Sequence, residues 1–191
     1  LTVTGTIDAR DIKAMRDEIT LLQNLILTNT TIAEYTGAEP GTAPAWYQNP
    51  TYPANVFPMY SLQFNTSLAT ISLPESITKI AADAFSNSAN LETVILGNQL
   101  LIIESQAFNA ATKLSNIAFP ATLQTIRSNS FNYCLKLESL HIPASVIEIM
   151  DNAFGRDCPA YITVDESNPN YSATDGYLFN KDKTILVSAT A

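Results

Sequence analysis

A spacing of 23 residues between apolar positions limits the possible folds of this chain more than any other feature. Four consecutive segments, which begin at Leu68, Leu91, Leu114 and Leu137, carry an apolar residue at each of six equivalent positions. The other five columns are Ile71, Val94, Ile117 and Leu140; Leu73, Leu96, Phe119 and Ile142; Ile77, Leu100, Leu123 and Val146; Ile80, Ile103, Ile126 and Ile149; and Phe85, Phe108, Phe131 and Phe154. Since 46% of the chain is apolar, the odds of 24 chance matches are on the order of 10⁻⁸. One unit cannot bury its apolar side alone, so the repetition predicts stacked coils that share a core.

Each unit begins with a pattern that is typical of a short, half-buried strand. Thr70 and Ser72 alternate with the apolar Ile71, which is the period of two expected for a strand. In three copies a proline follows and ends the strand, because proline has no N–H to donate to a ladder; in the other copy Gly97 takes this place. The three prolines are Pro74, Pro120 and Pro143. A polar residue three positions before the phenylalanine, such as Ser105, suits the N-cap of a single helical turn.

The same phase continues upstream in weaker form. Residues 22–44 and 45–67 are each interpreted as one degenerate coil, because Leu25 lies two periods before Ile71. Before them, the segment LTVTG predicts a strand, and DARDIKAMRDEI predicts an amphipathic helix. Apolar residues in that helix are spaced by three or four positions. They are Ile12, Met15, Ile19 and Leu22.

Downstream, the period is lost and turn signals take over. Residues 159–191 contain Asp175-Gly176 and a polar stretch at 180–183 between short apolar runs, which predicts a hairpin that caps the last coil. We therefore expect a single domain over residues 1–191. It divides into degenerate N-terminal coils with a Pro/aromatic-rich insertion (1–67), four regular repeats (68–158) and a C-terminal cap (159–191).

The repeat motif resembles that of the bacterial BspA-like leucine-rich repeat proteins. It is carried by LATISLPESITKIAADAFSNSANL and again by LSNIAFPATLQTIRSNSFNYCLKL. The resemblance implies an α/β repeat solenoid of about seven coils, a right-handed leucine-rich-repeat stack with a parallel β-sheet on one face. Short helical or irregular returns and a C-terminal β-hairpin cap complete this prediction. The family brings no catalytic residue and no cofactor, and it implies an extracellular or bacterial cell-surface protein.

Composition excludes several classes of partner. The formal net charge is −8 and no basic stripe is present, which argues against a nucleic-acid partner. No apolar run reaches the roughly 18 residues that a membrane-spanning helix needs. Zinc-ligand spacings and glycine-rich phosphate loops are absent from the sequence. We therefore expect no metal and no cofactor.

Candidate chemistry is sparse. His141 is the lone histidine and is placed on the outward side of its strand, away from the inward Cys134, so a catalytic pair is not expected. Cys134 and Cys158 occupy adjacent coils; they are interpreted as buried free thiols, with a disulfide as the alternative. Four acidic residues near the C-terminus lack the spacing of a calcium loop and are interpreted as turn carboxylates. They are Asp165, Glu166, Asp175 and Asp182.

Two surfaces are candidates for binding. The first is the outward row of the strand face, which is small, polar and nearly neutral and suits a broad protein contact. Its residues are Thr70, Ser72, Thr93, Ile95, Asn116, Ala118, Ser139 and His141. The second is the proline-rich aromatic segment with Trp46, Tyr47 and Tyr52, whose rings either anchor a protein or glycan partner or pack against the solenoid.

These features bear on three possible functions. The first is a non-enzymatic adhesin that binds host matrix, host cell-surface or other bacterial proteins, which the family resemblance implies. The second is a structural spacer within a larger surface protein, favoured by a sequence that starts at Leu1 inside a predicted strand. An enzyme is the third and is disfavoured by the lack of a catalytic constellation.

Overall fold

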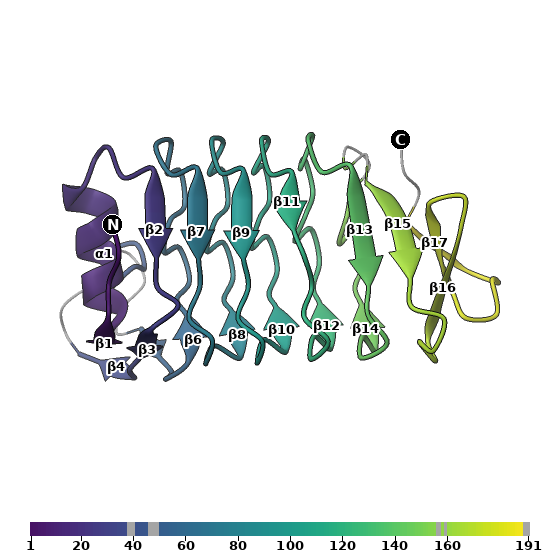
Figure 1. Cartoon of the computed structure of the whole chain (residues 1–191), viewed down its shortest axis with the longest axis horizontal. Helices are drawn as coiled ribbons and strands as arrows, with labels where there is room; N and C mark the ends of the chain where they lie inside the picture. The colour runs from purple at the N-terminus through teal and green to yellow at the C-terminus, as the bar shows by residue number, and fades with distance from the viewer. Residues whose placement is uncertain (38–40, 46–49, 156–157, 159, 189–191) are drawn as a thin grey trace.

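Coils stacked along one axis make up the molecule (Figure 1). The structure is a computed structural model that describes residues 1–37, 41–45, 50–155, 158 and 160–188. One short parallel strand per coil forms what we call the strand face. Its strands are β2 (Asn24–Ile26), β7 (Thr70–Ser72), β9 (Thr93–Ile95), β11 (Asn116–Ile117), β13 (Ser139–Ile142) and β15 (Tyr161–Val164). The predicted repeat solenoid of about seven coils is confirmed.

A second parallel sheet runs along another side of the stack. It has the order β14-β12-β10-β8-β6. Its strands are β6 (Val56–Phe57), β8 (Lys79–Ile80), β10 (Ile102–Ile103), β12 (Thr125–Ile126) and β14 (Glu148–Ile149). Phe57 pairs with Ile80, and Ile80 with Ile103, so the spacing of 23 residues predicted this register correctly.

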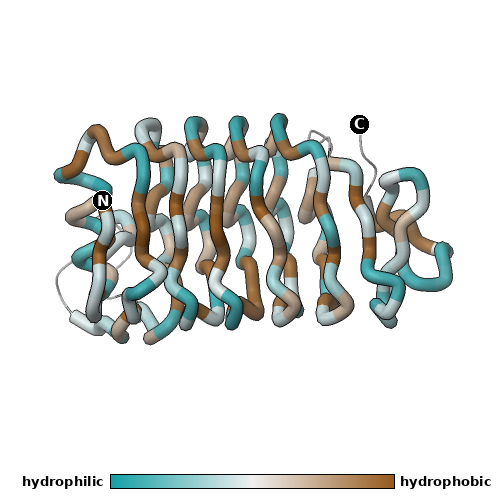
Figure 2. Tube along the Cα trace, viewed as in Figure 1, coloured by the Kyte–Doolittle hydropathy of each residue, from teal (hydrophilic) through white to brown (hydrophobic). Residues whose placement is uncertain are grey.

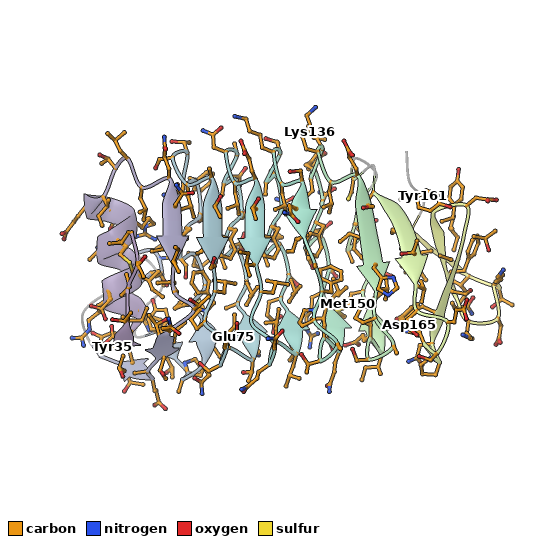
Figure 3. The ribbon with its side chains drawn as sticks, viewed as in Figure 1. Tyr35, Glu75, Lys136, Met150, Tyr161 and Asp165 are labelled. Atoms are coloured by element: carbon orange, nitrogen blue, oxygen red, sulfur yellow. The ribbon has the colours of Figure 1, made fainter. Side chains whose placement is uncertain are left out.

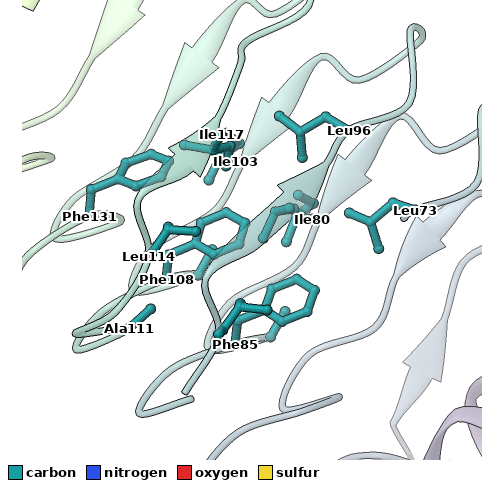
Figure 4. Close-up of a cluster of buried hydrophobic side chains, with 14 of the residues drawn as sticks. Leu73, Ile80, Phe85, Leu96, Ile103, Phe108, Ala111, Leu114, Ile117 and Phe131 are labelled. Atoms are coloured by element: carbon teal, nitrogen blue, oxygen red, sulfur yellow. The ribbon is translucent and has the colours of Figure 1, made fainter. Parts of the chain in front are cut away.

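The repeat columns fill the space between these two sheets (Figure 4). All of them are buried except Phe119 and Ile149, which are half-buried. The phenylalanines form one internal pile with Phe57 at its N-terminal end. Ring centroids are 5.0 Å apart for Phe57–Phe85 and Phe85–Phe108, 5.2 Å for Phe108–Phe131 and 5.9 Å for Phe131–Phe154. Figure 2 shows apolar residues recurring in each coil, whereas the central turns along the upper edge of that view are hydrophilic.

The returns between the sheets are irregular, and the predicted helical turn does not form. The residue after each expected N-cap has a positive φ, which a right-handed helical turn cannot contain. These residues are Asp83 (57°), Gln106 (60°), Asn129 (58°) and Asn152 (57°). Four residues further on, Asn87, Ala110 and Tyr133 repeat the left-handed conformation, so two reversals bend each coil back toward the strand face.

The N-terminal region differs from the predicted coil count. On the strand face, β2 pairs directly with β7, with Leu25 opposite Ile71, so residues 22–67 contribute one strand there and not the two that two coils would need. On the side of the second sheet the period of 23 continues, since the Asn55 N–H donates to the carbonyl of Ile32 just as the Thr78 N–H donates to that of Asn55, both at 2.8 Å. The additional length includes the antiparallel pair β4 (Tyr35–Thr36) and β5 (Thr51–Tyr52). The prediction of two coils is therefore met on the second side of the stack and not on the strand face.

The predicted N-terminal helix is present and covers the first coil. It is α1 (Ala9–Glu18), with Asp8 as the N-cap and Asp11 completing a capping box. Ile12 and Met15 are buried beneath it. Before the helix, β1 (Gly5–Ile7) pairs in parallel with β3 (Thr30–Ile32), and Thr2 forms a bridge with Ile26.

The C-terminal end carries the predicted antiparallel cap. β16 (Tyr171–Thr174) pairs with β17 (Tyr177–Asn180), which pairs with β18 (Leu186–Ser188). β15 precedes the cap and still belongs to the stack, since it pairs in parallel with β13 at a spacing of 22 residues. The solenoid therefore extends one strand beyond the four regular repeats.

Candidate binding surface

Most of the predicted outward row is accessible on the strand face. Ile95 is 50% exposed, and Asn116, Ala118, Ser139 and His141 are also exposed. Thr70 and Thr93 are half-buried, whereas Ser72 is 8% exposed and contributes little surface. In parallel register, Thr70 lies opposite Thr93, which lies opposite Asn116. Neighbouring coils thus bring their outward side chains together as the row predicts.

The row is divided between two sheets. β2, β7, β9 and β11 form one sheet, and β13 and β15 form another. No strand pairing joins β11 to β13 among the described residues, although β12 and β14 remain paired on the second sheet. Ser139 and His141 therefore lie across a break from Asn116 and Ala118 in the ladder of the strand face. The periodic sequence contains no signal for this break.

A hollow of about 310 Å³ opens on the strand face between β9 and β11. It contains four residues of the predicted row: Thr93, Ile95, Asn116 and Ala118. The other lining residues are Val94, Leu96, Asn98, Phe119 and Pro120. None of these side chains is charged, so the hollow offers apolar surface with amide and hydroxyl groups at its sides.

His141 lies in a polar setting at the other side of the break. Its Nδ1 is 3.0 Å from Thr163 Oγ1 on β15. Tyr161 and Asp165 lie at opposite ends of this strand (Figure 3). Hydrogen bonds from Ser167 are the main cause that lowers the pKa of the Asp165 carboxyl, followed by a small contribution from the charge of His141. The Asp165 carboxylate accepts from the Ser167 N–H, as expected for a turn carboxylate.

The structure separates His141 from Cys134. Cys134 is completely buried, and its Sγ donates to the carbonyl of Phe108 at 3.2 Å. Burial raises the pKa of this thiol well above its usual value, so it is held protonated and is a poor nucleophile. Cys158 is also buried, and both cysteines are free thiols.

The aromatic segment is placed only in part. Trp46 and Tyr47 lie outside the described residues. Tyr52 is 2% exposed, and its hydroxyl accepts from the N–H of Ala43 at 2.8 Å. Its ring stacks on Tyr35 with centroids 6.1 Å apart. Tyr52 is therefore a packing residue in this structure rather than an exposed anchor.

Contacts with α1 hold the described part of this segment against the first coil. The Nη1 of Arg16 donates to the carbonyls of Thr42 at 3.1 Å and Tyr60 at 3.0 Å. Arg10 lies over the ring of Tyr35, 4.5 Å from its centroid. The excursion is thus fastened to the helix that covers the first coil.

Several residues of the surface were missed at the level of sequence. Asn98, Phe119 and Pro120 line the hollow, and Tyr161 and Thr163 extend the row onto β15. Gly97, which departs from the proline column, was the available signal for the hollow. For β15 the signal was an alternation of apolar and polar residues displaced by one position from the period.

In the part of the chain that the structure describes, no group of three or more His, Cys, Asp or Glu side chains is arranged to hold a metal ion. No helix in these ranges is both long and apolar enough to span a membrane.

Comparisons with solved structures agree with this architecture. A leucine-rich repeat protein from Eubacterium ventriosum is similar over 100% of this chain and 46% of its own, with a TM-score of 0.71 and 20% identity. The leucine-rich repeat protein of T. pallidum shares 34% identity over 56% of this chain and 49% of its own, with a TM-score of 0.53. The pneumococcal vaccine antigen PcpA is similar over 99% of this chain and 51% of its own, with a TM-score of 0.53 and 19% identity.

The chain thus spans about half the length of these three structures. No curated protein gives a significant match to the sequence. Six copies of the repeat described as "BspA type Leucine rich repeat region" match residues 49–168. These residues include the strands and the phenylalanine pile from β6 to β15. The chain therefore belongs to the BspA-type leucine-rich repeat family.

Proposed function

We propose that this protein is a non-enzymatic binding module of a bacterial cell surface, and that its strand face recognises a protein of the host matrix, of a host cell or of another bacterium. The observation that carries the proposal is the exposed row from Ile95 to His141 on a parallel stack, which contains no Asp, Glu, Lys or Arg side chain. Such a surface suits a broad contact between proteins, because few charged groups must be desolvated. Membership of the BspA-type family supports a binding role. Similarity to a pneumococcal vaccine antigen agrees with a surface location.

A binding assay with matched variants tests this proposal. The purified protein is applied to immobilised extracellular-matrix preparations and to bacterial envelopes over a range of salt concentrations. The variant Asn116→Arg/Ser139→Arg adds two positive charges to the exposed strand face. The control Gln124→Arg/Ile147→Arg adds the same charge at exposed positions beside β12 and β14.

Saturable binding is expected for the wild-type protein and the control. The strand-face variant is expected to bind at least about tenfold more weakly, a difference of about 1.4 kcal/mol. Equal loss in both variants would show that added charge, rather than the strand face, determines binding. The absence of saturable binding to every preparation would contradict the adhesin proposal.

A structural spacer is the second candidate, and the continuity of the apolar core from α1 to β15 supports it. A spacer needs a stiff stack and no recognition surface. Tethering the protein between two beads and measuring its extension tests stiffness. A spacer is expected to hold a constant length under load, together with no binding in the assay above.

A further inference from the structure

A hydrogen bond recurs at the end of the strands on the strand face. The Leu27 N–H donates to the carbonyl of Ser72 at 2.8 Å, and the Leu73 N–H donates to the carbonyl of Ile95 at 2.9 Å. In each case the residue just after a strand donates to the coil that follows. This bond joins consecutive coils where their strands end.

The next bond in this series is missing. By the repeat, the Leu96 N–H should donate to the carbonyl of Ala118. Among the described residues, neither group has a hydrogen-bond partner. The pairing of β9 with β11 stops at Val94 and Ile117, one residue earlier than the pairing of β7 with β9. A backbone donor and a backbone acceptor that lack this bond therefore belong to residues that line the hollow.

Gly97 allows the loop after β9 to lie close to the preceding coil. A Cβ on Gly97 would lie 2.2 Å from the carbonyl oxygen of Pro74, so a proline at this position could not approach the preceding coil so closely. Asn98 fastens the same loop to that coil, because its N–H and its Nδ2 donate to Glu75 Oε2 at 3.2 and 3.0 Å. We number the coils by their strands on the strand face, so that β7, β9, β11 and β13 belong to coils 3, 4, 5 and 6. The loop after β9 lies close to coil 3 and leaves space on the side of coil 5.

Beside the hollow, a hydrogen-bonding side chain joins the coil of β11 to the coil of β9. The Thr122 hydroxyl, at 2.9 Å from both carbonyl oxygens, joins coil 5 to the carbonyls of Asn98 and Leu100. Ala118 is small and exposed, and it does not fill the space between Ile95 and the next coil. Coils 4 and 5 thus separate at Leu96 and Ala118, and Thr122 joins them again a few residues further along the chain.

We infer that this hollow binds an extended peptide segment, with an uncharged apolar residue of the segment placed against Ile95, Ala118 and Phe119. The inference rests on the proposed function and names the part of the strand face that reads the partner. Backbone groups of an extended segment point to alternate sides, so one carbonyl can accept from Leu96 while one N–H donates to Ala118. No charged side chain lines the hollow, so a charged residue of the segment would lose water without gaining an ion pair.

A peptide selection tests this inference. A phage library of random heptapeptides is selected on the wild-type protein, and the enriched peptides are synthesised. Their affinity is measured for the wild-type protein, for Ala118→Leu, which fills the hollow, and for the control Gln124→Leu. Both positions are exposed, but Gln124 lies beside β12, outside the outward row, and does not line the hollow. The shift of the Leu96 backbone amide is followed by NMR during each titration.

We expect the enriched peptides to share an uncharged apolar residue and to shift the Leu96 amide. Ala118→Leu is expected to weaken binding at least about tenfold, and Gln124→Leu by less than about twofold. No enrichment, an enriched charged residue, or affinity that Ala118→Leu leaves unchanged would overturn the inference. Displacement of the peptide by a trimer of N-acetylglucosamine, with the same dependence on Ala118, would overturn it in favour of a glycan.

The protein-binding assay described above distinguishes a failure of the peptide inference from a failure of the proposed function. A matrix or envelope preparation whose binding depends on Asn116 and Ser139 but not on Ala118 leaves the proposed function in place and overturns the peptide inference. Loss of binding with Ala118→Leu alone, at unchanged binding of Gln124→Leu, supports both.

Discussion

Single residues in this protein act through their place in a column. The ring of Phe108 lies between those of Phe85 and Phe131, and it is nearly parallel to Phe85 at an interplanar angle of 2°. Cys134 and Cys158 occupy a neighbouring column, where both are buried. Gly97 acts through the side chain that it lacks, because without a Cβ the loop after β9 can lie close to Pro74. The effect of a substitution on stability therefore depends on the neighbours that the residue has in the coils before and after it.

Alkaline pH tests the burial of the two cysteines. Burial raises the pKa of the Cys158 thiol from 9.0 to about 11 and also raises the pKa of Cys134. As the pH rises above 9.0, the unfolded chain releases these protons while the folded protein keeps them, so the free energy of unfolding falls toward pH 11.

Urea unfolding at several pH values across this window measures the effect. The double variant Cys134→Ala/Cys158→Ala lacks both thiols, and its stability is expected to decline less steeply with pH than that of the wild type. Equal slopes for the two proteins would contradict the assignment of the alkaline loss to these cysteines.

At the scale of elements, the C-terminal cap is fastened by one buried amide. Asn168 is fully buried, and its Nδ2 donates to the carbonyls of Pro143 at 2.9 Å and Val146 at 3.1 Å. Its Oδ1 accepts from the N–H groups of Asn170 at 2.8 Å and Tyr171 at 2.9 Å. The side chain thus joins the turn of coil 6 to the start of β16.

Removing this amide is expected to loosen the cap. Asn168→Ala leaves buried donors and acceptors unpaired, and we predict a loss of about 2–3 kcal/mol in the free energy of unfolding. Hydrogen exchange in β16 and β17 should accelerate more than in β7 and β9. Asn170→Ala is the control, because its Nδ2 makes one long contact of 3.5 Å with Val146. Equal effects of the two substitutions would contradict this role of Asn168.

The elements also show which features could be predicted from the sequence. The register of β6, β8 and β10 was predictable, because each apolar column is needed to close the core of its coil. The helical turn was not, since Asp83 and its equivalents adopt a left-handed conformation. Three of these four residues are Asp or Asn, which are enriched in that conformation but also common at helix N-termini, so the pattern did not separate the two structures. Upstream, the period of 23 holds for the second sheet but not for the strand face. The excursion through β4 and β5 adds residues to the chain without adding a strand to that face.

At the scale of the whole molecule, one apolar core extends from α1 to β15 and the strand face follows it. The outward row could be predicted, because the strand period alone determines which side chains point outward. The hollow could not, because it depends on how closely Gly97 approaches Pro74 and on a missing bond between two coils. The break between β11 and β13 likewise arises from packing between coils, which a periodic sequence does not record.

Contacts between the phenylalanine rings test the stacked-coil account most directly. In a sample with NMR labels on phenylalanine alone, the rings of Phe57, Phe85, Phe108, Phe131 and Phe154 are assigned by single substitutions. The account predicts nuclear Overhauser effects between consecutive members of the pile, whose centroids are 5.0–5.9 Å apart, and none between members two coils apart. Contacts that skip a coil, or rings that contact only solvent, would contradict it.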